Sequence, residues 1–245
     1  MRIALFGDIH ANLEALEAVL ADAREQHCSD YVCLGDVVGY NANPAECLEI
    51  VREMNCPVVK GNHDEDASGD HSLETMNPTA ATALMWTREQ LNQEQREWLR
   101  KMRMVRQVAD FTVVHSTLDQ PTNWNYVTNR FDAMSNFSYQ FTQICFNGHT
   151  HVPRVYVKSD RVQEVPAESV VIEARRWPGA PTAPTKIASP VRLTVRYCRS
   201  AAPDRATMTS LPLNVGAAEV AVPSVIDAMA PVIGFDRDAS RCRLF

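Results

Sequence analysis

The chain lacks a long apolar run and an excess of positive charge, and these two absences exclude whole classes of protein. No apolar stretch approaches the length of a transmembrane helix, and the apolar residues 3–6 are too few for the core of a signal peptide. The net charge at pH 7 is −6, so the sequence offers no basic surface for nucleic acid. We therefore expect neither a membrane nor a nucleic-acid polymer among the partners.

The sequence also lacks any Cys-x-x-Cys pair, although it contains seven cysteines. Their number is odd and their spacing is unlike the disulfide framework of an exported protein. Reduced thiols and the missing export signal favour a cytoplasmic location. The spacing also argues against a structural zinc knuckle, because such knuckles use closely spaced cysteine pairs.

What the sequence does contain is 245 residues with 45% hydrophobic content, enough to bury a full core. Apolar runs and turn signals predict strands at 2–7, 31–35, 57–60, 111–114 and 144–147, and a hairpin of 155–158 with 162–165. Apolar periodicity and capping residues predict helices over 12–26, 43–54, 77–91, 92–102 and 131–141. The polar residues 65–70 predict a loop. This alternation of strands and helices indicates an α/β or α+β fold.

The composition changes beyond about residue 172. Residues 173–212 are rich in Arg, Ala, Pro and Thr with weak periodicity, which predicts a partly irregular segment. Residues 220–235 are apolar again, but Pro223 and Pro231 interrupt any long element. We therefore expect a principal domain at 1–172 and a divergent C-terminal tail at 173–245.

Side chains of the kind that bind metals follow the predicted strands. Ligands and chemistry gather at the carboxyl ends of strands in open α/β sheets, so these side chains predict one shared site. The candidate ligands are Asp8, His10, Asp36, Asn62, His115, His149 and His151. The alternative, that they only cap turns, is poor because buried carboxylates clustered without cations would repel each other.

This ligand set is too large for one tetrahedral zinc ion and fits two divalent ions that share a ligand. Asp36 is the candidate bridge, because each of its carboxylate oxygens can bind one ion. Imidazole and carboxylate ligands without thiolate suit Mn²⁺, Fe, Zn²⁺ or Co²⁺, and the order of metal affinities alone does not choose among them. Two such ions clamp a phosphoryl group and generate a hydroxide from water at neutral pH.

Two further groups of residues near these strand ends have candidate roles. His63 follows the better ligand Asn62, so it suits transition-state stabilisation or protonation of the leaving group, with Asp64 orienting its ring. Trp124 and Tyr126 lie in the loop after His115, where they either border a substrate base or pack on the surface.

The motifs that carry these residues resemble, in type and order, those of the calcineurin-like metallophosphoesterases. They are Asp8-Ile-His10, Gly35-Asp36-Val-Val-Gly39, Gly61-Asn62-His63-Asp64, the lone His115 and Gly148-His149-Thr-His151. The resemblance covers roughly the first two thirds of the chain. Its Gly-Asp-Val-Val-Gly-Tyr variant is similar to the small bacterial and archaeal stand-alone branch, which includes YfcE-like and diadenosine-tetraphosphatase-like proteins.

The resemblance implies a four-layer α-β-β-α sandwich with a dinuclear site. One metal would take Asp8, His10, Asp36 and His151, and the other Asp36, Asn62, His115 and His149. Relatives close their second sheet with an Asn-Pro-Gly-Ser-type turn and a Gly-x-Pro-Arg segment. In this chain the nearest equivalent of that turn is residues 213–216, far downstream in the tail. The resemblance therefore implies that the tail is the segment that would complete the second sheet.

The resemblance also narrows the function to hydrolysis of phosphoric esters by the dimetal-bound hydroxide. Gly39-Tyr40 stands where the protein phosphatase branch has a phosphate-binding arginine. The expected substrate is therefore a small phosphorylated compound, with nucleotides as one candidate, rather than a phosphoprotein. The alternative is a catalytically silent scaffold of the same fold, which the altered tail keeps open.

Overall fold

The computed structural model describes residues 2–74 and 76–165 with their side chains. In the C-terminal part it describes the backbone of residues 171–172, 191–192, 194–201, 205–212, 219–223 and 232–233. The helices of these ranges are α1 (Leu13–Glu25), α2 (Pro44–Glu53), α3 (Asn62–Ser68), α4 (Pro78–Gln90), α5 (Gln93–Lys101) and α6 (Arg130–Ser138), with a 3₁₀ turn η1 at Pro121–Asn123.

The strands follow the same order along the chain. They are β1 (Ile3–Phe6), β2 (Asp30–Cys33), β3 (Val105–Val108), β4 (Phe111–Val114), β5 (Ile144–Asn147), β6 (Val155–Lys158), β7 (Val162–Val165), β8 (Val171–Ile172), β9 (Val191–Arg192), β10 (Thr194–Ala201), β11 (Arg205–Pro212), β12 (Glu219–Pro223) and β13 (Val232–Ile233).

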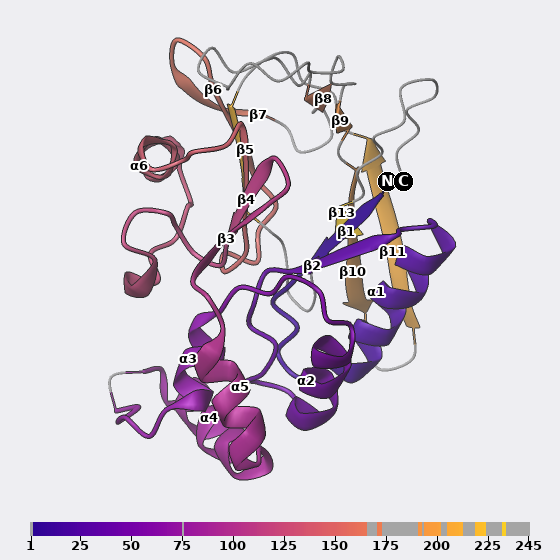
Figure 1. Ribbon diagram of the computed structural model, residues 1–245, viewed down its shortest axis with the longest axis vertical. Helices are drawn as coiled ribbons and strands as arrows, with labels where there is room; N and C mark the ends of the chain where they lie inside the picture. The colour runs from indigo at the N-terminus through magenta and orange to yellow at the C-terminus, as the bar shows by residue number, and fades with distance from the viewer. Residues whose placement is uncertain are drawn as a thin grey trace.

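The first sheet is built on the parallel pair β1 and β2, with Ile3 opposite Asp30. β13 lies beside β1, in a sheet with β10 and β11. The apolar face of α1, with Leu16 and Val19, packs on β1 because its 3.6-residue period places these side chains on one side. The same core includes Leu48 from α2, so α1 and α2 form one outer layer (Figure 1).

The second sheet has the order β3-β4-β5-β12-β6-β7. β12 runs parallel to β5, with Val220 opposite Ile144, and antiparallel to β6. On the outer face, Phe137 of α6 packs with Tyr156 of β6. The two sheets and their helical covers confirm the expected α-β-β-α sandwich (Figure 1).

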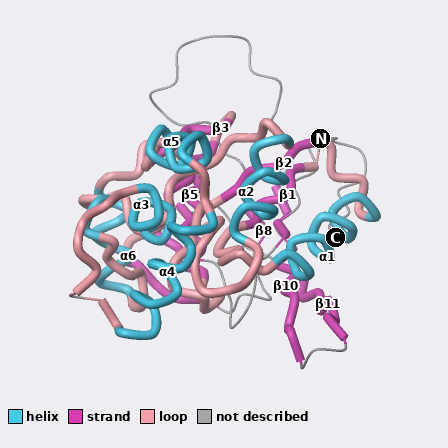
Figure 2. Tube along the Cα trace, turned by 90° about the horizontal axis from the view of Figure 1, so that it is seen from below, coloured by secondary structure: helices cyan, strands magenta, loops and turns pink. Residues whose placement is uncertain are grey.

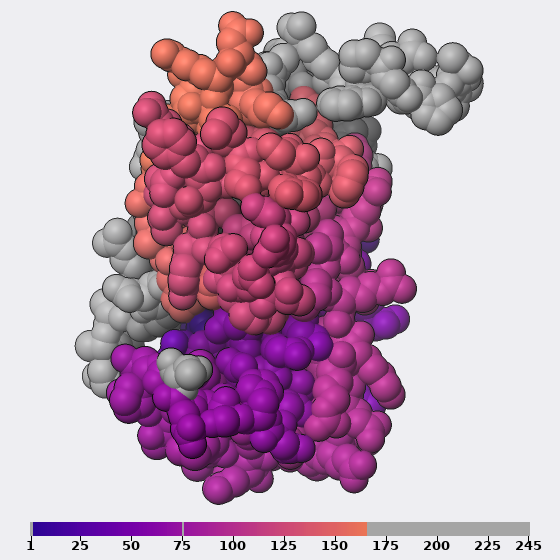
Figure 3. Space-filling model, turned by 90° about the vertical axis from the view of Figure 1, so that its left-hand side faces the viewer, coloured from indigo at the N-terminus to yellow at the C-terminus, as the bar shows by residue number. Residues whose placement is uncertain are grey.

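The remaining helices α3, α4 and α5 gather at one end of the molecule (Figures 1 and 2). In space-filling view, the earlier part of the chain, in indigo and purple, lies below the later part, in rose and orange. The two blocks meet across the middle of the visible face (Figure 3). No helix in the described ranges is both long and apolar enough to cross a membrane.

Most of the predicted elements up to residue 165 are confirmed within a few residues, and three expectations are corrected. The expected strand 57–60 forms only single bridges, at Val58 and Val59, and β3 is a strand that the pattern did not predict. The expected loop 65–70 is α-helical up to Ser68, because α3 begins at Asn62. The Asp64 side chain accepts a hydrogen bond from the Gly61 N–H at 3.0 Å and so caps the start of α3. The polar residues that predicted a loop therefore belong to a helix.

The tail also differs from the expectation. Within 173–212, residues 191–192, 194–201 and 205–212 are strands, and β10 pairs with β11 from Thr194–Pro212 to Ala201–Arg205. Antiparallel pairing between the neighbouring strands β10 and β11 overrides their weak local signals. Residues 173–190 and the expected turn at 213–216 lie outside the described residues. The division of the chain at residue 172 stays a prediction.

The position of β12 yields a test of whether the tail belongs to the domain. Ala221 lies in the middle of β12, between β5 and β6. We expect Ala221→Pro to destabilise the protein by about 3 kcal/mol or more, because proline removes a ladder N–H from a central strand. Urea unfolding followed by circular dichroism measures the change. Ala221→Ser keeps the N–H and is the control; equal midpoints for both variants would contradict the placement of β12.

Candidate metal centre

Five of the seven candidate ligands lie in turns whose backbone is held in the left-handed region. The φ angles are 51° at Asp8, 50° at His10, 50° at Asp36, 71° at His149 and 52° at His151. Non-glycine residues adopt this conformation at a cost, and such residues concentrate at functional sites. Hydrogen bonds between the turns hold it: the Asp8 N–H donates to Gly35 O and the His10 N–H to Asp36 O, both at 2.8 Å.

These turns bring the acidic and imidazole side chains into three overlapping groups. One group joins Asp8, His10 and His151; another joins Asp36, His115 and His149; and the third joins His10, Asp36 and His63. The first two match the two ligand sets that the family resemblance implies, apart from Asn62 and the shared Asp36. Because the third group contains both His10 and Asp36, it links the first two into one continuous site.

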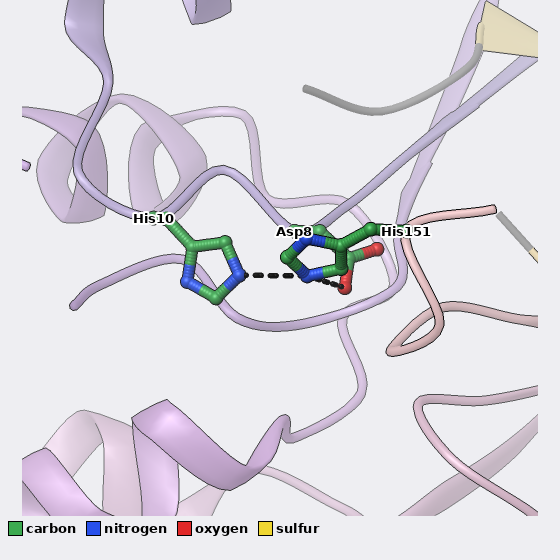
Figure 4. Close-up of side chains that lie close together, drawn as sticks. All are labelled: Asp8, His10 and His151. Carbon is green, nitrogen blue, oxygen red and sulfur yellow. Dashed lines mark hydrogen bonds and ion pairs between the residues drawn. The ribbon is translucent and has the colours of Figure 1, made fainter. Parts of the chain in front are cut away.

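The distances between these atoms are those of ligands that share an ion. His10 Nε2 lies 3.1 Å from His151 Nε2, which lies 3.4 Å from Asp8 Oδ1 (Figure 4). Asp36 Oδ2 lies 3.2 Å from His115 Nε2 and 3.6 Å from His10 Nε2. Two ligands at ~2.0–2.2 Å from one ion stand roughly 3 to 3.5 Å apart. The side chains therefore fit divalent cations.

Backbone carbonyls orient two of the imidazoles. His115 donates its Nδ1–H to Leu34 O at 2.7 Å, and His149 donates its Nε2–H to Trp124 O at 2.8 Å. In the neutral ring this leaves a lone pair on His115 Nε2 and on His149 Nδ1. Outer hydrogen bonds of this kind fix the tautomer of metal-binding histidines.

Three buried polar atoms of the cluster and its edge have no hydrogen-bond partner within the described ranges: Asn62 Oδ1, His63 Nδ1 and His115 Nε2, the last of which lies 3.2 Å from Asp36 Oδ2. A buried carbonyl oxygen normally accepts a hydrogen bond or binds a cation. Asn62 opens α3 directly after Gly61, where an added Cβ would overlap the Asp36 carboxylate. The unpaired Asn62 oxygen, next to the glycine that packs on Asp36, therefore fits the predicted role of a further ligand.

The electrostatics of the site favour ionised carboxylates and mostly neutral imidazoles. Burial opposes the charge on Asp8, but the hydrogen bond from His151 and the nearby imidazoles lower its pKa to about 2. Burial lowers the pKa of His10 to about 3 and that of His149 to about 4, so both are in the form that binds metals. Burial also opposes the charge on His115, yet Asp36 raises its pKa to about 9.

Asp64 has a different role from the expected one. Its Oδ1 accepts the N–H groups of Val37 and Val38 at 2.9 and 3.3 Å, and its Oδ2 accepts that of Gly61. Both carboxylate oxygens of Asp64 thus accept hydrogen bonds from backbone N–H groups. The expectation that Asp64 orients the His63 ring is therefore wrong for this structure. Asp64 instead holds the turn after Asp36 against the start of α3.

Aromatic neighbours and backbone carbonyls around the cluster also shape the site. The His63 ring packs beside His10 and Tyr40, with ring centroids 4.7 and 4.4 Å away. Tyr126 stacks on His149 at 4.0 Å. The carbonyls of Leu34 and Trp124 are backbone atoms, so no residue type in the sequence could have indicated their role.

The fold and the cluster together define a class: an α-β-β-α sandwich with a candidate metal centre at its strand ends. Comparison with known proteins identifies the family. The model of the calcineurin-like phosphoesterase superfamily domain matches residues 1–189. The chain belongs to the calcineurin-like phosphoesterase superfamily, which the order of its motifs had indicated.

The similar proteins include bacterial and archaeal examples. A metallophosphoesterase from Sphaerobacter thermophilus is 39% identical, with a TM-score of 0.60 and 71% of each chain covered. Uncharacterized protein MJ0912 of Methanocaldococcus jannaschii is 36% identical over 157 residues, which are 62% of this chain and 63% of that protein. The match thus spans less than two thirds of that relative. The hypothetical protein PH1004 from Pyrococcus horikoshii is 15% identical and shares the fold, with a TM-score of 0.57. The structural match covers 87% of this chain and 88% of that protein's chain.

The two glycines that flank α3 offer a matched test of the site's packing. Gly61 precedes the helix and Gly69 follows it. An added Cβ at Gly61 would overlap the Asp36 carboxylate, whereas at Gly69 it would meet only the ring of the exposed His71. We expect Gly61→Ala to reduce the Mn²⁺ bound per chain at least tenfold and Gly69→Ala to leave it unchanged, as measured by metal analysis after dialysis. Equal metal content would show that Asp36 is not needed for binding.

Proposed function

We propose that this protein is a metal-dependent phosphoesterase that hydrolyses a small phosphorylated compound. The observation that carries the proposal is the pair of ligand groups that meet at Asp36, whose Oδ2 faces both His10 Nε2 and His115 Nε2. Family membership supports the reaction class, and the absence of the protein phosphatase arginine at Gly39-Tyr40 supports a small substrate.

The proposed metal content is two divalent ions, with Mn²⁺ first and Fe, Zn²⁺, Co²⁺ or Ni²⁺ as alternatives. Asp8, His10, Asp36 and His151 would hold one ion, and Asp36, Asn62, His115 and His149 the other. When bound, two such ions polarise a phosphoryl group and lower the pKa of the attacking water. A cytoplasmic location stays a prediction.

The chain's own residues position the reacting groups. The His63 N–H donates to Asp36 Oδ1 at 2.9 Å, which leaves Oδ2 directed at the imidazoles. The His149 N–H donates to Asp8 Oδ1 at 2.8 Å and holds that carboxylate against the later part of the chain. These backbone donors fix both carboxylates before any ligand binds, which is the preorganisation that electrostatic catalysis requires.

His63 is the proposed catalytic residue, because it belongs to the cluster but is not among the proposed ligands. It is 4% exposed, and its Nδ1 has no hydrogen-bond partner in the described part of the chain. Burial lowers its pKa, so a proton that it carries is easily given up. It would stabilise the phosphoryl group or protonate the leaving oxygen.

The direct test is hydrolysis of bis(p-nitrophenyl) phosphate and p-nitrophenyl phosphate with and without Mn²⁺. We expect added Mn²⁺ to raise turnover at least tenfold and a chelator to abolish it, because the ligand set fits divalent ions. The rate of p-nitrophenol release measures both effects. Folded, metal-loaded protein without turnover would instead support the scaffold alternative.

Two substitutions separate the role of His63 from that of Asp36. We expect His63→Ala to lower kcat by about 10²- to 10⁴-fold with little change in bound metal, since proton transfer contributes on that scale. Asp36→Asn should lower both metal content and kcat, because the amide supplies only one oxygen. Steady-state kinetics and metal analysis give the two readouts.

The exposed His71, which pairs with Asp66, supplies the control variant His71→Ala. It should match the wild-type protein in both measurements. If His63→Ala lost metal as completely as Asp36→Asn, His63 would be a ligand rather than a catalytic residue.

A further inference from the structure

An exposed aromatic ring lies against one of the candidate ligands. Tyr126 stacks on His149 with ring centroids 4.0 Å apart and planes only 10° from parallel. His149 is 7% exposed, whereas Tyr126 is 55% exposed. The tyrosine ring therefore forms the boundary between a buried ligand and solvent: one face rests on the imidazole, and much of the ring remains uncovered.

The loop around Tyr126 is anchored on both sides of the ring. Before it, Trp124 has a left-handed φ of 54°, and its carbonyl accepts the His149 Nε2–H. After it, Val127 is buried, 1% exposed, in the core beneath α6. A ring held at both neighbours presents a fixed planar surface, so a planar partner that stacks on it costs little ordering of the protein.

A second half-exposed ring borders another part of the cluster. Tyr40 is 49% exposed and packs on His10 and His63, 4.7 and 4.4 Å away between centroids. Two aromatic side chains from distant segments thus flank the site, one beside each proposed set of ligands.

The simpler explanation is that Tyr126 only steadies His149. The His149 imidazole is already held by its hydrogen bond to Trp124 O, and the backbone N–H of His149 donates to Asp8 Oδ1. A further packing contact would not need the large exposed area that Tyr126 retains. Exposed aromatic faces beside phosphate-binding chemistry are the means by which proteins stack the bases of nucleotides.

We propose that Tyr126 is a stacking platform for a planar aromatic group attached to the substrate's phosphate, which makes nucleoside phosphates the preferred class. This inference rests on the proposed function for its phosphate, but it concerns binding and can be tested without turnover.

The test compares two ligands that differ only by a base: adenosine 5′-monophosphate and ribose 5-phosphate. Isothermal titration of the Mn²⁺-loaded protein at low temperature gives Kd for each. We expect the wild-type protein to bind the nucleotide about tenfold more tightly, the scale of one stacked base. Tyr126→Leu should remove this difference, and Tyr126→Phe, which keeps the ring, should retain it. Tyr139→Leu, at an equally exposed tyrosine after α6, is the control and should behave as wild type.

Three results would overturn the inference: equal Kd values for the two ligands in the wild-type protein, a difference that survives Tyr126→Leu, or a loss of bound Mn²⁺ in Tyr126→Leu. The last would assign the ring to the support of His149. Failure of the proposed function has a separate sign, the lack of metal-stimulated ester hydrolysis, which leaves these binding comparisons intact.

Discussion

Two buried carboxylates impose the constraint on which the rest of this structure depends. Asp8 and Asp36 are each 1% exposed, and an isolated buried charge is too costly to retain. Each carboxylate is therefore surrounded by donors: a backbone N–H from His149 or His63, and imidazoles from several turns. These compensating groups come from both blocks of the molecule, so neutralising the charges also holds the two halves of the sandwich together.

The same constraint explains the backbone around the site. Five of the candidate ligands adopt left-handed φ angles, which are unfavourable for residues with a side chain. Close packing leaves no room for a larger residue at the glycines beside these turns. An added Cβ at Gly148 would lie 2.8 Å from Asp8 Oδ2, and at Gly39 it would lie 2.5 Å from His63 Nδ1. Asp64 contributes in the same way, since its carboxylate ties the turn after Asp36 to the first residues of α3. The fold thus gives up some stability to hold the candidate ligands in place, as expected for a preorganised site.

Much of the fold up to residue 165 follows from local pattern, and the departures have a common cause. Strands such as 111–114 and 144–147 were predictable because a short apolar run has few alternatives. The helix α3 was missed because its polar residues are stabilised by a cap at Gly61 rather than by an apolar face. β12 was not predicted because it is defined by its partners β5 and β6, which lie far away in sequence.

The sequence by itself determined which residues could bind metals and that they follow apolar strands, because side-chain chemistry and strand propensity are local properties. It also indicated the superfamily, since the order of the motifs is written along the chain. Only the tertiary structure decided which candidate ligands lie together, such as His10 and His151, which are 141 residues apart. It also decided which ring nitrogen of His115 and of His149 donates to a backbone carbonyl, that Asp64 binds backbone, and that Tyr126 covers His149. These are distances between segments remote in sequence, and they exist only once the two sheets have packed.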